Sequence, residues 1–118
     1  MKPQDTYIEF LIEQFAPLGG ITPRRMFGGH CLYCDGTVFA LVAKNSLFLK
    51  VDGENKGEFE KYGSKPFRPQ GHPGVSMSYY EAPAEIFEDP DAMRYWVGGA
   101  VSAGRRAAAT KRPRKRKL

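Results

Sequence analysis

The sequence predicts an α+β fold in which helices cover an antiparallel sheet. Three observations point to this class. Residues 24–51 hold three apolar runs that alternate with two turn signals, which is typical of a three-stranded meander. Amphipathic helical patterns precede and follow this stretch. At 118 residues, the chain is also long enough for one domain with a hydrophobic core that needs no disulfide or structural metal.

The first predicted element is an amphipathic helix over residues 4–17. Tyr7, Leu11 and Phe15 repeat at helical spacing and form its apolar stripe. Pro17 and the two glycines that follow it should end the helix. We expect the apolar side to pack on the sheet.

An antiparallel meander is predicted next, with strands over residues 29–34, 37–43 and 47–51. Asp35 and Gly36 favour a type I′ hairpin turn, which requires positive φ at both central residues. Residues 44–46 form a weaker turn signal. Gly28 and Gly29 interrupt the first apolar run, which indicates a bulge or a close backbone approach.

A second helix is predicted over residues 53–62, with Asp52 as its N-cap. Residues 63–74 are rich in proline and glycine and predict a loop with a short strand near Phe67. Residues 75–80 alternate with period two, so another strand is expected there.

The last helix is predicted over residues 90–106, because Asp89 and Pro90 form a favourable helix start. Its apolar stripe consists of Met93, Trp96, Val97, Ala100 and Val101. Gly98 and Gly99 interrupt the pattern and cost about 1 kcal/mol each relative to alanine. They indicate either a close helix–sheet approach or a less stable helix end.

The charges are distributed unevenly along the chain, whose net charge is +5. Residues 1–104 carry ten cationic and thirteen anionic side chains, a net charge of about −3, and residues 105–118 carry eight cations. We therefore divide the chain into a domain at 1–104 and a basic tail at 105–118, and we expect disorder beyond Ala109. Nucleic-acid contact is predicted for Lys111, Arg112, Arg114, Lys115, Arg116 and Lys117. The alternative is a solubilising arm without a fixed partner.

Metal binding and catalysis are not favoured by the sequence. Cys31 and Cys34, preceded by His30, form a single C-x2-C pattern, and cysteines three apart on a strand should project to opposite faces. We therefore expect no metal and no cofactor. Arg24 and Arg25 could hold an anion, with a solvated pair or an interior salt bridge as the alternatives. The sequence contains no nucleophile elbow and no phosphate-binding loop motif, so no catalytic residue is assigned.

A cytoplasmic protein without membrane contact is expected. No apolar run approaches the roughly 18 residues that a membrane span needs. No signal-peptide pattern follows the N-terminus, and the cysteines are therefore expected to be reduced.

Several segments match a known family. "RRMFGG" at 24–29, "LY.DG..FALVA" at 32–43 and "VSMSYYE.P" at 75–83 together resemble the TfoX/Sxy N-terminal domain family over residues 5–102. The resemblance implies a two-layer fold with a mostly antiparallel five-stranded sheet, in the order helix, three strands, helix, two strands, helix. The signature residues, with a structural or an interface role, are Arg24, Arg25, Met26, Phe27, Gly28, Gly29, Ser78, Tyr79 and Tyr80.

The family takes its name from regulators of natural competence that act with a cyclic-AMP receptor protein at competence promoters. The resemblance therefore implies a regulatory or adaptor role in transcription without catalysis. The expected partners are nucleic acid through the tail, a protein of the transcription machinery and, as a further alternative, a second copy in a homodimer. The runner-up function is a small-molecule-binding domain or a small enzyme with a site near Arg24, Arg25 and Tyr79.

Overall fold

The computed structural model describes residues 3–26, 29–43, 45–67 and 78–111. Its elements follow one another as α1 (Pro3–Phe15), the 3₁₀ turn η1 (Ala16–Leu18), β1 (Ile21–Met26), β2 (Gly29–Cys34), β3 (Thr37–Ala43), β4 (Ser46–Lys50), α2 (Lys56–Tyr62), β5 (Tyr79–Glu81), the 3₁₀ turn η2 (Ala84–Phe87) and α3 (Pro90–Lys111).

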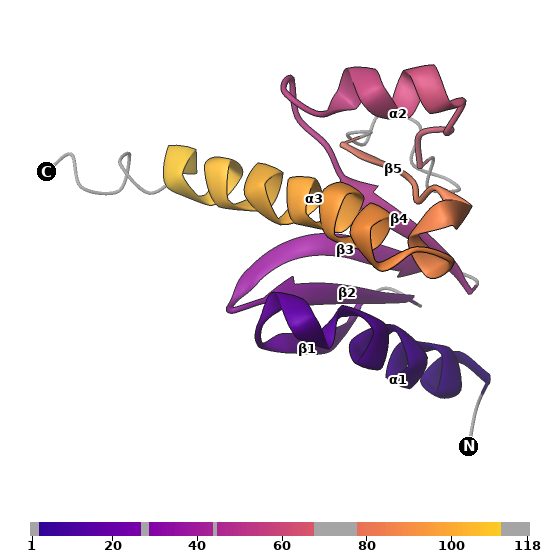
Figure 1. Cartoon of the computed structure of the whole chain (residues 1–118). Coiled ribbons are helices and arrows are strands. Elements are labelled where there is room, and N and C mark those ends of the chain that lie inside the picture. The colour runs from indigo at the N-terminus through magenta and orange to yellow at the C-terminus, as the bar shows by residue number, and fades with distance from the viewer. Residues whose placement is uncertain (1–2, 27–28, 44, 68–77, 112–118) are drawn as a thin grey trace, which may run out of the picture.

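The five strands form one antiparallel sheet in the order β1-β2-β3-β4-β5, and helices α1 and α3 lie over one of its faces (Figure 1). The predicted class, an α+β fold with a five-stranded antiparallel sheet covered by helices, is confirmed. A single hydrophobic core joins this face to the helices, with Leu11 and Phe15 of α1 and Val97 of α3 fully buried against it. In the part of the chain that the structure describes, no helix is long and apolar enough to cross a membrane.

The predicted order of strands and helices along the chain was wrong. Among the described residues, four strands precede α2 and one follows it, because Ile21–Met26 forms the additional strand β1. β1 pairs with β2 along its whole length, from Ile21 opposite Cys34 to Met26 opposite Gly29. Its sequence lacks alternation and contains Pro23, which argues against a strand. The proline is tolerated because β1 is an edge strand.

The expected strand near Phe67 is only an isolated bridge, in which Pro66 lies opposite Tyr80. Backbone hydrogen bonds from Phe67 N to Tyr79 O (2.8 Å) and from Glu81 N to Lys65 O (2.9 Å) flank this bridge. The strand predicted over 75–80 is described only from residue 78, and β5 occupies 79–81.

The meander was predicted correctly at β2, β3 and β4. Asp35 and Gly36 both have positive φ (50° and 86°), as a type I′ turn requires, and Asn45 has φ 61° in the next turn. A bulge in β3 leaves Phe39 without a partner on β2, so that Phe39 and Ala40 are both fully buried although they are consecutive. The bulge therefore adds an aromatic side chain to the core, where Phe39 meets Phe15 edge to face.

Two helix boundaries differ from the predicted ones by three residues or more. Helix α2 begins three residues later than expected, and Asn55 rather than Asp52 is its N-cap residue. Asp52 lies in the turn before the helix, where its carboxylate accepts hydrogen bonds from Arg106 and from the backbone N–H of Glu54. Helix α3 continues to Lys111, so residues 105–111 are helical rather than part of a disordered tail. The remainder of the predicted tail, 112–118, lies outside the described residues.

Close backbone contacts explain two glycines. A Cβ at Gly29 would overlap the backbone oxygen of Val42, and a Cβ at Gly104 would overlap that of Val38. By contrast, a Cβ at Gly98 would meet nothing within 4 Å. The close approach of α3 to the sheet, which was one interpretation of the Gly98–Gly99 pair, is therefore made by Gly104.

Candidate functional site

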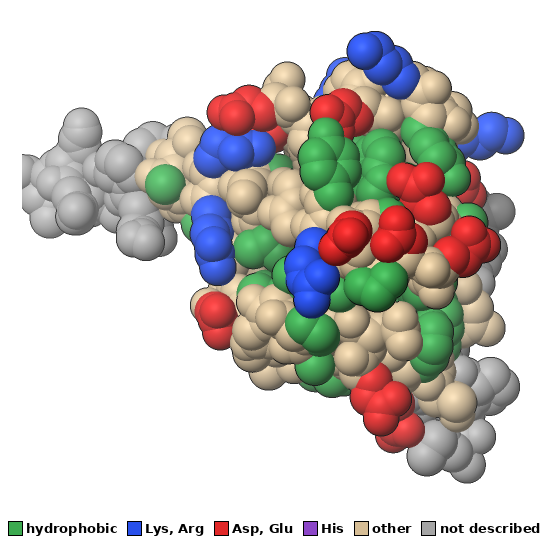
Figure 2. Space-filling model, in the orientation of Figure 1, with side chains coloured by type: hydrophobic (Ala, Val, Ile, Leu, Met, Phe, Trp, Pro, Cys, Tyr) green, Lys and Arg blue, Asp and Glu red, His purple; other side chains and the backbone are tan. Residues whose placement is uncertain are grey.

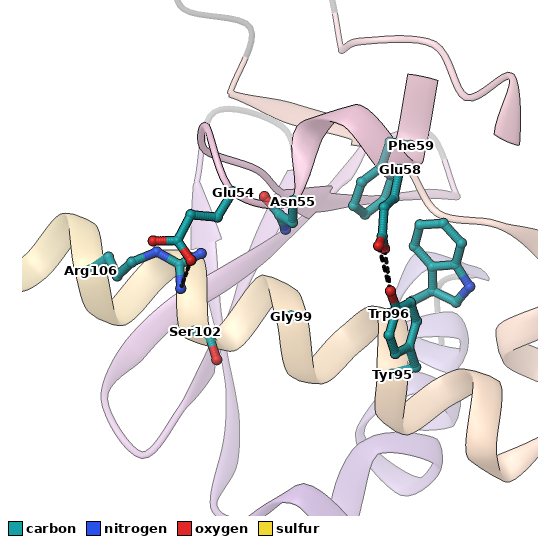
Figure 3. Close-up of a pocket in the computed structure, with 9 residues that line it drawn as sticks. All are labelled: Glu54, Asn55, Glu58, Phe59, Tyr95, Trp96, Gly99, Ser102 and Arg106. Atoms are coloured by element: carbon teal, nitrogen blue, oxygen red, sulfur yellow. Dashed lines mark hydrogen bonds and ion pairs between the residues drawn. The ribbon is translucent and has the colours of Figure 1, made fainter. Parts of the chain in front are cut away.

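A cleft of about 260 Å³ lies between α2 with its preceding turn and the middle of α3 (Figure 3). Residues 95, 99, 102 and 106 of α3 form one wall, since they are spaced one helical turn or two apart. The lining residues are Glu54, Asn55, Glu58, Phe59, Tyr95, Trp96, Gly99, Ser102 and Arg106. An adjoining hollow of about 390 Å³ is bordered by Glu58, Lys61, Tyr62, Tyr95 and Trp96.

Aromatic rings surround one end of this cleft. Trp96 is nearly buried, and Phe59, Tyr62 and Tyr95 each meet it edge to face, with centroid separations of 4.9, 5.7 and 5.7 Å. Tyr62 and Tyr95 stay 47% and 58% exposed, so about half of each residue faces solvent. Figure 2 shows hydrophobic and acidic side chains interspersed on this face of the molecule.

Carboxylates hold the polar groups of the cleft in place. The Tyr95 hydroxyl lies 2.5 Å from both oxygens of the Glu58 carboxylate, and this hydrogen bond raises the pKa of Tyr95. The Trp96 indole N–H donates to Glu85 at 2.7 Å. The phenol therefore stays protonated, and the indole N–H is satisfied within the protein.

At the other end of the cleft, Arg106 is held by two carboxylates. Its Nε and Nη2 donate to the two Asp52 oxygens at 2.6 and 2.9 Å, and its Nη1 lies 3.4 Å from Glu54. The hydrogen bond from Arg106 lowers the pKa of Asp52, and a further hydrogen bond from the Glu54 backbone N–H acts in the same direction. This fork-to-carboxylate pair ties the last turns of α3 to the segment before α2.

The second face of the sheet carries a different group of side chains. The Arg24 guanidinium lies 6.0 Å from the Tyr33 ring centroid, and the Lys50 ammonium lies 5.0 Å from that of Tyr79. Burial, with smaller contributions from Cys31 and Tyr33, raises the pKa of Tyr79 to about 12. Burial also raises the pKa of the Cys31 thiol, although the charge of Arg24 opposes that shift.

Arg24 and Tyr79, which were predicted to share a small-molecule site, lie on opposite edge strands of the sheet. Arg25 lies on β1 opposite His30, next to Arg24 in the chain. The structure therefore does not bring these three predicted site residues together around one cavity.

Three of the described signature residues make contacts that link neighbouring segments of the fold. Met26 Sδ accepts from the Cys31 thiol at 3.6 Å, and Ser78 O accepts from Val51 N at 2.9 Å. Tyr80 is buried, and its hydroxyl donates to Glu60 at 2.8 Å. Phe27 and Gly28 lie outside the described residues.

The two cysteines point to opposite sides of β2, as predicted. Cys34 belongs to the core and donates to Leu18 O at 3.6 Å, whereas Cys31 contacts Met26 on the other face. Across residues 3–26, 29–43, 45–67 and 78–111, no three His, Cys, Asp or Glu side chains gather as a metal site would require.

Of the six cations predicted to contact nucleic acid, Lys111 is the last residue of α3. The other five, Arg112, Arg114, Lys115, Arg116 and Lys117, lie outside the described residues.

The cleft was not predicted from the sequence. Its signal was a second stripe on the last helix, formed by Tyr95, Gly99, Ser102 and Arg106 beside the apolar one. A glycine and two polar residues on such a stripe normally indicate a solvated surface. Only the position of α2 turns this surface into a cleft.

The fold and the cleft define a small open-sheet α+β domain with an aromatic and acidic surface between two helices. Comparison with protein families identifies it more closely. The chain belongs to the TfoX N-terminal domain family, whose model matches residues 13–104. It is also 28% identical over 92 residues to the DNA transformation protein TfoX1 of Aliivibrio fischeri. That alignment covers 75% of this chain but only 44% of the relative, so the chain matches less than half the length of that protein.

Proposed function

We propose that this chain is a non-enzymatic regulatory adaptor related to DNA transformation, which binds a protein of the transcription machinery and gains nucleic-acid affinity from its C-terminal cations. The family membership carries this proposal, supported by the name of the relative, a DNA transformation protein. The exposed aromatic rings of the cleft also support it, since aromatic residues are enriched where proteins bind one another.

The predicted contribution of the cations follows from their placement. Lys111 ends α3, whose last turns extend beyond the sheet (Figure 1), and five more cations follow it within six residues. Neutralising phosphates releases counterions, so this affinity should depend strongly on salt and weakly on sequence.

Duplex DNA binding by full-length protein and by residues 1–110 tests this role. The truncation removes six cations and changes the net charge from +5 to about −1, but it retains Arg106. Fluorescence anisotropy should show weak binding by the full chain, with a log–log salt slope of up to about −5 for six contacts. The truncated chain should bind little or none.

Charge reversal provides a matched control. Lys115→Glu with Arg116→Glu should weaken binding to all duplexes similarly, because contacts to phosphates do not read bases. Lys56→Glu with Lys65→Glu makes the same change in net charge at two exposed positions of the body and should have a much smaller effect. If residues 1–110 bind one sequence as tightly as the full chain does, the body is the DNA reader and the proposal for the cations is wrong.

A further inference from the structure

We propose that the cleft between α2 and α3 binds an arginine side chain on a basic segment of a partner protein. This inference rests on the proposed adaptor role, and it assigns that role a surface and a partner chemistry. Three features of the cleft support it, namely its aromatic walls, the carboxylates in and beside it, and the open wall at Gly99.

The aromatic walls have the arrangement that attracts a cation. Tyr62 and Tyr95 line the hollow and stand at 69° and 86° to the Trp96 ring, so neither ring stacks face to face on the indole. The face of an aromatic ring carries negative electrostatic potential and attracts guanidinium and ammonium groups. Both tyrosines are about half exposed, so an incoming side chain can reach them.

The charges in and around the cleft favour the same occupant. The carboxylates of Glu54 and Glu58 line the cleft, and two more, Glu85 and Asp52, are hydrogen-bonded to its lining residues Trp96 and Arg106. The two cations there are Arg106, which is already paired with Asp52 and Glu54, and Lys61, which is exposed. Glu58 lines both hollows, and its carboxylate accepts a hydrogen bond from the neutral Tyr95 hydroxyl.

One wall of the cleft is open at Gly99. A Cβ there would meet only the Asn55 amide nitrogen, at 4.0 Å. Packing within the domain therefore does not require glycine at this position, although glycine costs about 1 kcal/mol in a helix. The missing side chain gives a partner segment room to lie against α3.

Arginine fits this combination better than other side chains. Its planar guanidinium can stack on an aromatic ring while its fork of N–H donors contacts a carboxylate. In this cleft, the rings of Tyr62 and Tyr95 and the carboxylate of Glu58 border one hollow and could be contacted together.

Trp96 is the only tryptophan of the chain, so its fluorescence reports directly on this site. The test is a titration of full-length protein with a hexa-arginine peptide, with hexaglutamate as the probe of opposite charge. We expect a saturable fluorescence change with hexa-arginine alone. Glu58→Gln and Tyr62→Ala should each raise Kd by about threefold to tenfold, which corresponds to about 0.7–1.4 kcal/mol.

Glu9→Gln is the matched control, because it removes the same charge from an exposed position on α1 and should leave Kd unchanged. Glu58→Gln should also leave duplex DNA binding unchanged, which separates this inference from the role of the C-terminal cations. Equal weakening by Glu9→Gln and Glu58→Gln, or no saturable signal, would overturn the assignment. Binding that appears only after residues 112–118 are removed would identify the chain's own cations as the occupant and would equally overturn it.

Discussion

At the scale of single residues, burial raises the pKa of Tyr79 to about 12. Below about pH 10, the phenol is protonated in both the folded and the unfolded chain. Between about pH 10 and 12, the unfolded phenol ionises while the folded one stays protonated, so ionisation favours unfolding. Tyr79 should therefore contribute stability that is lost as the pH rises through this range.

Replacing this tyrosine tests the effect. The melting temperature of the parent should fall more steeply between pH 10 and 12 than that of Tyr79→Phe, whereas the two should run parallel below pH 9. Thermal denaturation followed by circular dichroism measures both profiles. Parallel profiles up to pH 12 would show that the phenol ionises equally easily in the folded and the unfolded chain.

At the scale of secondary-structure elements, α3 offers a matched pair of glycines. A Cβ at Gly104 would overlap the backbone oxygen of Val38, whereas a Cβ at Gly98 would meet nothing within 4 Å. Gly104→Ala should lower the melting temperature by about 5 °C or more, because the helix must move away from the sheet. Gly98→Ala should raise it by about 3–5 °C, since alanine favours the helix. A change of the same sign for both variants in a thermal melt would contradict this account.

The elements that sequence could predict are those with a local physical signal. The Asp35–Gly36 turn and the strands around it follow from turn chemistry and alternation, and α1 follows from its apolar stripe. β1 was not predicted, because Ile21–Met26 does not alternate and contains Pro23, which an edge strand tolerates. The start of α2 was misplaced because Asp52, a suitable cap by type, accepts from the Glu54 backbone N–H in the turn before the helix and pairs with Arg106, 54 residues away in the chain.

The candidate site was even less accessible from the sequence. Its cleft exists because α2 lies beside α3, and nothing in the local sequence of either helix specifies how close the two helices lie. The role of Gly104 likewise depends on Val38, which lies on β3, far away in the chain. Arg24 and Tyr79 were predicted to lie near one site because of their residue types. The order of the strands places them on opposite edges of the sheet.

At the scale of the whole molecule, α3 connects the acidic body to the cationic C-terminal end. The cleft lies along the middle of the helix, and Arg106 fastens the helix to Asp52 before the cations of residues 111–117 begin. The family match ends at residue 104, two residues before this contact. A domain boundary placed at residue 104 would therefore remove Arg106, whose hydrogen bonds to Asp52 hold α3 to the body.

Two truncations test this boundary. Residues 1–110 should melt within about 2 °C of the full chain, because every ion pair between α3 and the body is retained among the described residues. Residues 1–104 should melt at a clearly lower temperature, since Asp52 loses its partner and the buried Ala103 comes to lie at a frayed helix end. Arg106→Ala in the full chain should reproduce part of this loss.

The pH dependence gives the decisive check. Arg106 lowers the pKa of Asp52 in the folded chain, so this pair contributes stability above the ordinary carboxyl pKa of about 4. The contribution is lost as the pH falls through the lowered value and the carboxylate becomes protonated. The difference in melting temperature between residues 1–110 and 1–104 should therefore be smaller at pH 3 than at pH 7. A difference that stays constant over this range would mean that the ion pair contributes nothing and that the length of the helix alone sets the boundary.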